Sequence, residues 1–277
     1  MSAHVLVLAA STDEGAALVA AAVAGSLGHG RVLCVRPADL GRARWSHRVD
    51  ASGAARTRIT LPDGTLLDDG RTGAVLNRLQ HIPAVGFGAA SAKNRDYAHA
   101  ELHALTASWL LSLGPRVVGG TAGAYGTAQG PISPMTALAV AVRCELPVAR
   151  RVTSTRAGLT GPLPPGLRVT PHLRWPGGRG APVPVDIGPE QTGPGDEDSA
   201  HRVLVAGDDV VGGGPVVPYA PHCRRLAERL DSRLLELRFL STGAGPALAE
   251  VDLFPPLDLP AHRTAVADLL MSLVEPA

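Results

Sequence analysis

Lysine is almost missing from this chain of 277 residues, in which Lys93 is the only one. The other basic residues are arginines, and 26 lysines and arginines against 25 aspartates and glutamates leave a formal net charge of +1. A protein that binds nucleic acid or an anionic membrane usually carries a broad excess of positive charge. The near balance therefore argues against nucleic acid and membrane as partners.

Cysteines are few, and the three present, Cys34, Cys144 and Cys223, form no CxxC motif. A sparse, odd set of this kind indicates reduced thiols and not a disulfide framework. The first residues, MSAHVLVLAAS, have no basic region ahead of their apolar run, so they lack the form of a secretory signal. No apolar run reaches the roughly 18 residues of a membrane span. We expect a cytoplasmic protein.

Several catalytic motifs are also missing. The loop after the first expected strand has no GxGxxG, and neither a P-loop nor a GxSxG elbow occurs. The glycine loop 119–130 lacks GK[ST]; it can line a ligand cleft, but we favour an interdomain connector. His99 and His103 have a spacing that can hold a metal on a helix, although Glu101 points away from both. We expect two surface histidines, and no metal site is predicted.

The N-terminal part shows the pattern of a parallel α/β unit. An apolar strand over 4–10, a helix over 14–27 capped near Ser11–Asp13, and a strand over 31–35 follow one another. A strand–helix–strand order of this kind predicts a parallel sheet. Further elements are expected as a hairpin over 56–61 and 65–67, a strand over 74–79, a helix over 95–113 and a strand over 117–118.

The rest of the chain is interrupted by a stretch rich in proline and glycine over 156–199. Only Leu167–Val169 and Val183–Val185 resemble strands there, so we expect an irregular segment. Regular elements are expected before and after it: a helix over 135–143, a hairpin of 202–206 and 210–211, a helix over 219–230, strands over 234–240 and 248–253, and a helix over 262–273.

Six segments, in this order, resemble the ATP-grasp ligases, and among them the peptide-modifying graspetide macrocyclases. They are VLNRL (75–79), RDYAHAE (95–101), SLGPRVV (112–118), SPMTALAVAVRCELPVARRVTS (133–154), RVLVAGDDVV (202–211) and ELRFLSTGAGPALAEVDLFPP (236–256). Each motif is loose, and their order is the strong part of the resemblance.

The resemblance implies an α/β fold in which a parallel-sheet pre-ATP-grasp lobe is followed by a reduced, antiparallel α+β lobe of the ATP-grasp kind. It divides the chain into an N-terminal domain (1–118), a connector and helix (119–155), an irregular segment (156–200) and a C-terminal ATP-grasp-like half (201–277).

The resemblance also implies a nucleotide site, and several of its residues are altered. The family holds ATP with two lysines, whose positions fall near Ser133–Pro134 and within 156–200; neither place has a lysine. Glu250 and Asp252 match the Glu-x-Asn metal motif, but Arg238 stands at the earlier acidic position. The guanidinium would repel Mg²⁺ and can bridge to the two carboxylates instead, and Glu236 can compensate. A structural ion pair left from a lost site is the alternative. No cofactor is expected.

Two more arginines match family positions. Arg202 matches an arginine that binds phosphate or acyl phosphate, with an exposed strand arginine as the alternative. Arg78 matches an arginine that follows the first hairpin, and we favour for it an ion pair to Glu101 or Asp96.

Three functions remain open from the sequence. The first is an ATP-independent enzyme of natural-product biosynthesis acting on a small carboxylate or peptide, with Arg202, Glu250 and Asp252 as catalytic residues and Arg78 and Arg238 holding substrate. The second is a non-catalytic pseudo-ligase that binds a peptide or a partner enzyme. The third is an active carboxylate–amine ligase with an atypical phosphate grip. A homodimer is left open.

Overall fold

The structure is a computed structural model that describes residues 3–80, 82–120, 133–149, 152–154, 167–171, 185–189 and 200–274. The expectation for the glycine loop 119–130 falls almost entirely outside these residues. So does most of the expectation for 156–199. Within the described part, no helix is both long and apolar enough to cross a membrane.

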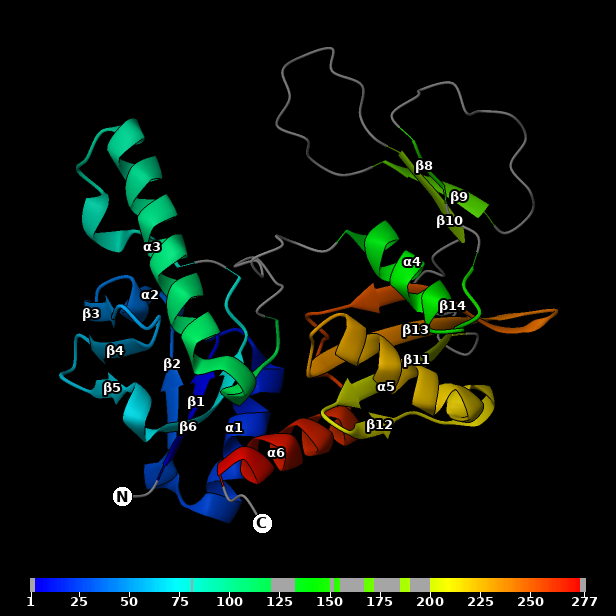
Figure 1. Cartoon of the computed structure of the whole chain (residues 1–277), viewed down its shortest axis with the longest axis horizontal. Coiled ribbons are helices and arrows are strands. Elements are labelled where there is room, and N and C mark those ends of the chain that lie inside the picture. The colour runs from blue at the N-terminus through cyan, green and yellow to red at the C-terminus, as the bar shows by residue number, and fades with distance from the viewer. Residues whose placement is uncertain are drawn as a thin grey trace.

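A four-stranded parallel sheet of order β2-β1-β6-β7 forms the centre of the N-terminal lobe (Figure 1). Its strands are β1 (His4–Leu8), β2 (Val32–Val35), β6 (Thr72–Asn77) and β7 (Val117–Val118). The central strands β1 and β6 are buried on both faces, which explains their nearly continuous apolar sequences. The predicted parallel sheet is confirmed.

Helices cover both faces of this sheet. Helix α1 (Glu14–Leu27) begins at Asp13, whose side chain accepts a hydrogen bond from the Ala16 amide, and packs on one face together with α6 (Pro260–Val274). Helix α3 (Ala92–Leu113) lies on the other face, with Ser91 as its N-cap. Its start is three residues earlier than the sequence pattern predicts, because the serine cap precedes the first apolar position.

A small antiparallel sheet, β3-β4-β5, packs against α3. It consists of β3 (Arg44–Val49), β4 (Ala55–Thr60) and β5 (Leu66–Asp68). The hairpin of β4 and β5 is predicted by the sequence, whereas β3 is not. Strand β3 has arginine and serine facing outward and Trp45 and His47 facing α3, and its one aliphatic residue, Val49, is exposed at its end, so it lacks a run of alternating aliphatic residues.

The C-terminal lobe contains an antiparallel sheet of order β12-β11-β13-β14. The expected hairpin and the two expected strands are present as β11 (Ala200–Ala206), β12 (Asp209–Val211), β13 (Leu234–Thr242) and β14 (Gly245–Asp252). One face carries Val203, Leu237 and Phe239 and is covered by α4 (Pro134–Arg143) and α5 (Ala220–Arg229).

Three further strands pair in the order β8-β10-β9. They are β8 (Val152–Ser154), β9 (Leu167–Pro171) and β10 (Val185–Pro189). The third differs from the expected strand Val183–Val185, because it begins where that strand was expected to end. The described residues of the Pro/Gly-rich segment are therefore extended and paired. In the described part of the chain, the shorter helical elements are α2 (Pro37–Leu40) and the 3₁₀ turns η1 (His29–Arg31), η2 (Asp69–Arg71), η3 (Val85–Phe87), η4 (Gly114–Arg116) and η6 (Gly214–Tyr219).

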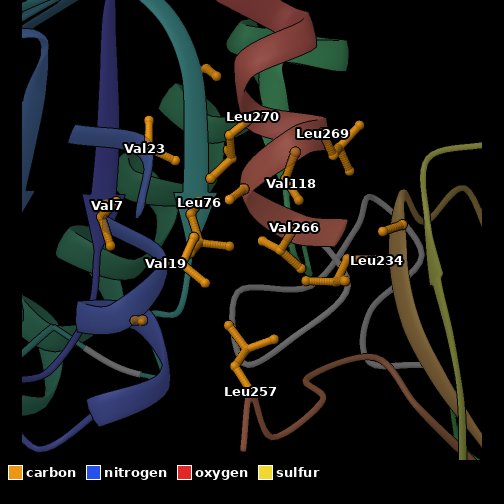
Figure 2. Packing of buried hydrophobic residues seen from close by; sticks show 14 of the residues in the cluster. Val7, Val19, Val23, Leu76, Val118, Leu234, Leu257, Val266, Leu269 and Leu270 are labelled. Atoms are coloured by element: carbon orange, nitrogen blue, oxygen red, sulfur yellow. The ribbon is translucent and has the colours of Figure 1, made fainter. Parts of the chain in front are cut away.

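The C-terminal helix α6 joins the two large sheets. Figure 2 shows Val266, Leu269 and Leu270 of α6 between Leu76 of the parallel sheet and Leu234 of the antiparallel sheet. Helix α6 contacts α1 and β6 on one side and β11 and β12 on the other. Burying a side chain of this size stabilises the folded state by about 1.5–3 kcal/mol. This cluster therefore brings the end of β6 close to the polar face of the antiparallel sheet.

Candidate functional site

The pairing of β13 with β14 decides which side chains face the N-terminal lobe. Arg238 lies opposite Glu250, but the next residue, Phe239, lies opposite Leu248. Ala249 is therefore the extra residue of a β-bulge, which reverses the alternation of β14 at this point. As a result, Leu248 joins Phe239 in the apolar core, and Glu250 lies on the other face with Arg238.

Five charged side chains share this face of the sheet. Arg202 of β11 lies opposite Arg238 of β13, and Glu236 lies opposite Asp252 of β14. Residues two apart on a strand point to the same side, so all of them and Glu250 face the same way. The structure thus brings Arg202, Arg238, Glu250 and Asp252 together on one face of the sheet, with Glu236, which the sequence analysis names as a compensating acid, beside them.

Arg202 binds two carboxylates at once. Its Nε and Nη2 donate to Oε1 and Oε2 of Glu236, both at 2.9 Å, and its Nη1 and Nη2 donate to Oδ2 and Oδ1 of Asp258 at 2.8 and 2.7 Å. Two-pronged pairs of this kind are the strongest ion-pair geometry of arginine. The hydrogen bonds to Asp258 and then to Glu236 raise the pKa of the Arg202 guanidinium. Arg202 is therefore partly buried and paired with two carboxylates, and the alternative of an exposed strand arginine does not hold.

Glu236 is buried, with only 6% of its surface exposed. Burial is the largest single influence and raises the pKa of its carboxyl, but His262 and Arg202 together outweigh burial and hold that pKa below its usual range. The Nδ1 atom of buried His262 lies 3.3 Å from Oε2 of Glu236, an ion-pair distance without the alignment of a hydrogen bond. Glu236 is thus ionised and held between two basic side chains.

Asp252 is the one acid of this face whose pKa is raised. Burial is the main cause, and the charge of neighbouring Glu236 adds to it, whereas a hydrogen bond of 2.7 Å from the Phe254 amide to Oδ1 opposes it. Arg78 and Arg202 lower the pKa of Asp252 as well, but by less than burial raises it. A half-buried carboxyl that is easily protonated is a candidate for proton transfer.

Arg78 joins the N-terminal lobe to the end of β14. Its Nε donates to Oδ2 of Asp13 at 2.8 Å, its Nη1 donates to the Pro255 carbonyl at 2.7 Å, and its guanidinium lies 3.9 Å from the centre of the Phe254 ring. The arginine is buried, and each of these contacts fixes it further. The expectation of a pair with Glu101 or Asp96 is wrong; both of those acids are exposed, and the partner is Asp13.

The acidic residues at the expected metal position have basic neighbours. Nη1 of Arg238 lies 3.9 Å from Oε2 of Glu250, and Glu236 is already bound by Arg202. Mg²⁺ prefers oxygen ligands, mainly carboxylates and phosphates. Among the residues that the structure describes, no cluster of three or more histidines, cysteines or acids is able to hold a metal ion. His99 and His103 are exposed on α3.

Sequence patterns do not find three members of this site. Asp13 is predicted as a helix cap, but nothing in the sequence links it to Arg78. Asp258 and His262 lie after β14, in a loop and in the first turn of α6, and carry no motif. Their role depends on the return of α6 to the parallel sheet, which periodicity does not reveal.

The opposite pKa shifts of Asp252 and Asp258 predict opposite effects of removing their charge. The raised pKa of Asp252 destabilises the fold once the pH exceeds that pKa, so Asp252→Asn should raise the melting temperature at pH 7. The gain should shrink as the pH falls through the folded pKa and vanish below about 3.9, the value of an unfolded aspartate.

Asp258→Asn is the matched control, because Arg202 lowers the pKa of Asp258. It should lower the melting temperature at pH 7, and the loss should disappear as the pH falls through the lowered pKa. Melting curves of the wild type and both variants between acid and neutral pH decide the matter. A lower melting temperature for Asp252→Asn at pH 7 would contradict the assignment.

Comparison with known proteins gives structural matches only. No protein-family model matches the chain, and no curated protein matches it. Among solved structures, the ATP-grasp ligase PsnB complexed with the precursor peptide PsnA2 and AMPPNP has a TM-score of 0.68 and 15% identity, covering 99% of this chain and 98% of that one. A RiPP-associated ATP-grasp ligase of Chryseobacterium gregarium, in complex with ADP and a leader and core peptide, has a TM-score of 0.67 and 10% identity, covering 98% and 97%.

The macrocyclase MdnC of Microcystis aeruginosa, bound with the precursor peptide MdnA, also matches, with a TM-score of 0.67 and 14% identity over 97% of this chain and 99% of that one. Identities this low establish a shared fold and leave the chemistry open. The expected α/β architecture, a parallel-sheet lobe followed by an antiparallel lobe, is confirmed. Over nearly its whole length, the chain has the fold of the ATP-grasp ligases.

Proposed function

We propose that this chain is a pseudo-ligase, which binds a peptide in the manner of its structural neighbours but does not use Mg-ATP. The peptide is suggested by PsnB and MdnC, which are known in complex with the precursor peptides PsnA2 and MdnA. A role in the tailoring of ribosomal peptides, alone or beside a partner enzyme, follows from the same likeness.

The observation that carries the proposal is the set of four hydrogen bonds made by Arg202. A cation that holds phosphate needs free N–H donors, and a carboxylate that holds Mg²⁺ needs free oxygens. Arg202 directs its donors to Glu236 and Asp258, so its N–H groups and an oxygen pair of each acid are already engaged. Arg78 is satisfied in the same way by Asp13 and Pro255. We infer a set of ion pairs that maintains the shape of the fold.

A second candidate, proton-transfer catalysis without ATP, is favoured by the raised pKa of Asp252. In that case Asp252 would exchange a proton with a bound carboxylate or peptide, with Glu250 and Arg202 beside it, and Arg238 would hold the substrate. The satisfied state of Arg202 and Arg78 makes this the weaker candidate. An active ATP-dependent ligase is the third outcome that the experiments below distinguish.

Arg238→Asp tests the loss of the metal site. The ion pair with Glu250 is partly exposed and long, so its removal should cost less than about 1 kcal/mol. The new carboxylate would join Glu250 and Asp252 on one face. Mn²⁺ should then raise the melting temperature of Arg238→Asp, but not that of the wild type or of Arg238→Asn, which removes the charge without adding a ligand. A rise for the wild type would refute the argument.

A displayed library of random peptides tests peptide binding directly. Selection on the wild type in EDTA should enrich related sequences that bind with dissociation constants of about micromolar. Mg-ATP should leave their affinity unchanged, and mass spectrometry should find their masses unchanged after incubation. No enrichment would contradict the proposal, as would binding that requires Mg-ATP. A change in mass that Asp252→Asn abolishes would favour the second candidate.

A further inference from the structure

The outer face of the small sheet β3-β4-β5 is unusually rich in arginine. Residues 42–58 contain five arginines and a single acid, Asp50, although the whole chain is nearly neutral. The inner residues of β3, Trp45 and His47, contact α3. The ring centres of Trp45 and Trp109 lie 5.5 Å apart, and His47 hydrogen-bonds to Ser108. The arginines of β3 and β4 (Arg44, Arg48, Arg56 and Arg58) are left on the side that faces away from α3, and all five are exposed.

Two of these arginines oppose each other without compensation. Arg48 of β3 and Arg56 of β4 are directly paired across the strands, an arrangement that destabilises a sheet when the charges are alike. Within the described part of the chain, neither forms an ion pair. Asp50 feels the charge of Arg56, but its Oδ1 already accepts hydrogen bonds from Ser52 and Ala54 in the turn between the strands.

A groove of about 560 Å³ lies beside this pair, bordered by Arg48, Arg56 and Arg58. The two acids in its lining, Asp68 and Asp69, already have partners within the protein. Asp68 pairs with Arg58 at 2.8 Å. Asp69 directly follows β5. It accepts hydrogen bonds from the Thr57 amide at 2.7 Å and from Nε1 of Trp109 at 2.9 Å. The donors of Arg48 and Arg56 are thus the ones available to a ligand.

We propose that this groove binds an acidic peptide segment, held by Arg48 and Arg56. Carboxylates two residues apart on an extended peptide point to the same side, about 6.6–6.8 Å apart, so a single segment can reach both guanidinium groups. Among the described residues that line the groove there is no aromatic ring on which a base would stack. A peptide therefore fits better than a nucleic acid.

The groove is separate from the charged face of β11, β13 and β14. Figure 1 shows the small sheet on the outer side of the N-terminal lobe, far from the antiparallel sheet. The inference therefore does not rest on the function proposed for that face. Because the two like charges of Arg48 and Arg56 repel each other, replacing both arginines should not lower the stability of the fold.

Fluorescence anisotropy with three labelled probes tests the inference: a peptide of alternating glutamate and serine, the same peptide with glutamine for glutamate, and a single-stranded oligonucleotide. At about 0.1 M NaCl the acidic peptide should bind roughly tenfold more tightly than its neutral counterpart, because it gains two charged contacts. About 1 M NaCl should abolish the difference, because salt screens exposed charges. The double variant Arg48→Gln/Arg56→Gln should bind the acidic peptide about fivefold or more weakly.

The matched control is Arg224→Gln/Arg229→Gln, which removes the same charge from the exposed side of α5. It should bind the acidic peptide as the wild type does. The melting temperature of Arg48→Gln/Arg56→Gln should be equal to or above that of the wild type, so weaker binding cannot come from unfolding. Equal affinity for the acidic and neutral peptides, an equal loss in the control, or tighter binding of the oligonucleotide would overturn the proposal.

Discussion

The packing of α6 between the two large sheets is the constraint on which the rest of this structure depends. Its apolar residues are buried against β6 and α1 of the N-terminal lobe and against β11 of the C-terminal lobe. An apolar contact has no direction of its own, but it fixes the distance between the sheets. The polar residues that meet at the junction must then find partners across it, because a buried charge without a partner is costly.

The polar contacts near the junction satisfy this demand. The Arg78–Asp13 pair lies within the N-terminal lobe, and Arg202 of β11 pairs with Asp258, which precedes α6. The hydrogen bond from Arg78 to the Pro255 carbonyl connects the end of β6 to the segment after β14. Such pairs contribute little net stability compared with apolar packing, but breaking one leaves a buried charge. The bond from Arg78 to Pro255 therefore helps to hold the lobes in one arrangement.

The sequence predicts the elements of this fold well where the pattern is local. The cap near Ser11–Asp13, the length of α1 and the presence of strands β13 and β14 depend on nearby residues, and the structure bears them out. The site is harder. The bulge at Ala249 decides that Glu250 faces the junction and Leu248 does not, and simple alternation gives no sign of it. Asp258 and His262 join the site only through the placement of α6.

Strand β3 shows a different limit. Its outward residues are two arginines and a serine, and its buried-side contacts are made by Trp45 and His47, so aliphatic alternation does not reveal a strand there. The near-neutral charge of the whole chain likewise hides the arginines that β3 and β4 bring together. Composition describes an average over the chain, whereas a binding surface depends on which residues a sheet places side by side.

We propose above all that this chain, although it has the fold of the ATP-grasp ligases, does not bind Mg-ATP, because its cations and carboxylates are already paired with one another. Isothermal titration calorimetry of the wild type with Mg-ATP measures this most directly. The account predicts no binding tighter than about millimolar, which corresponds to about 4 kcal/mol. A micromolar isotherm, or release of ADP when a peptide is added, would contradict it.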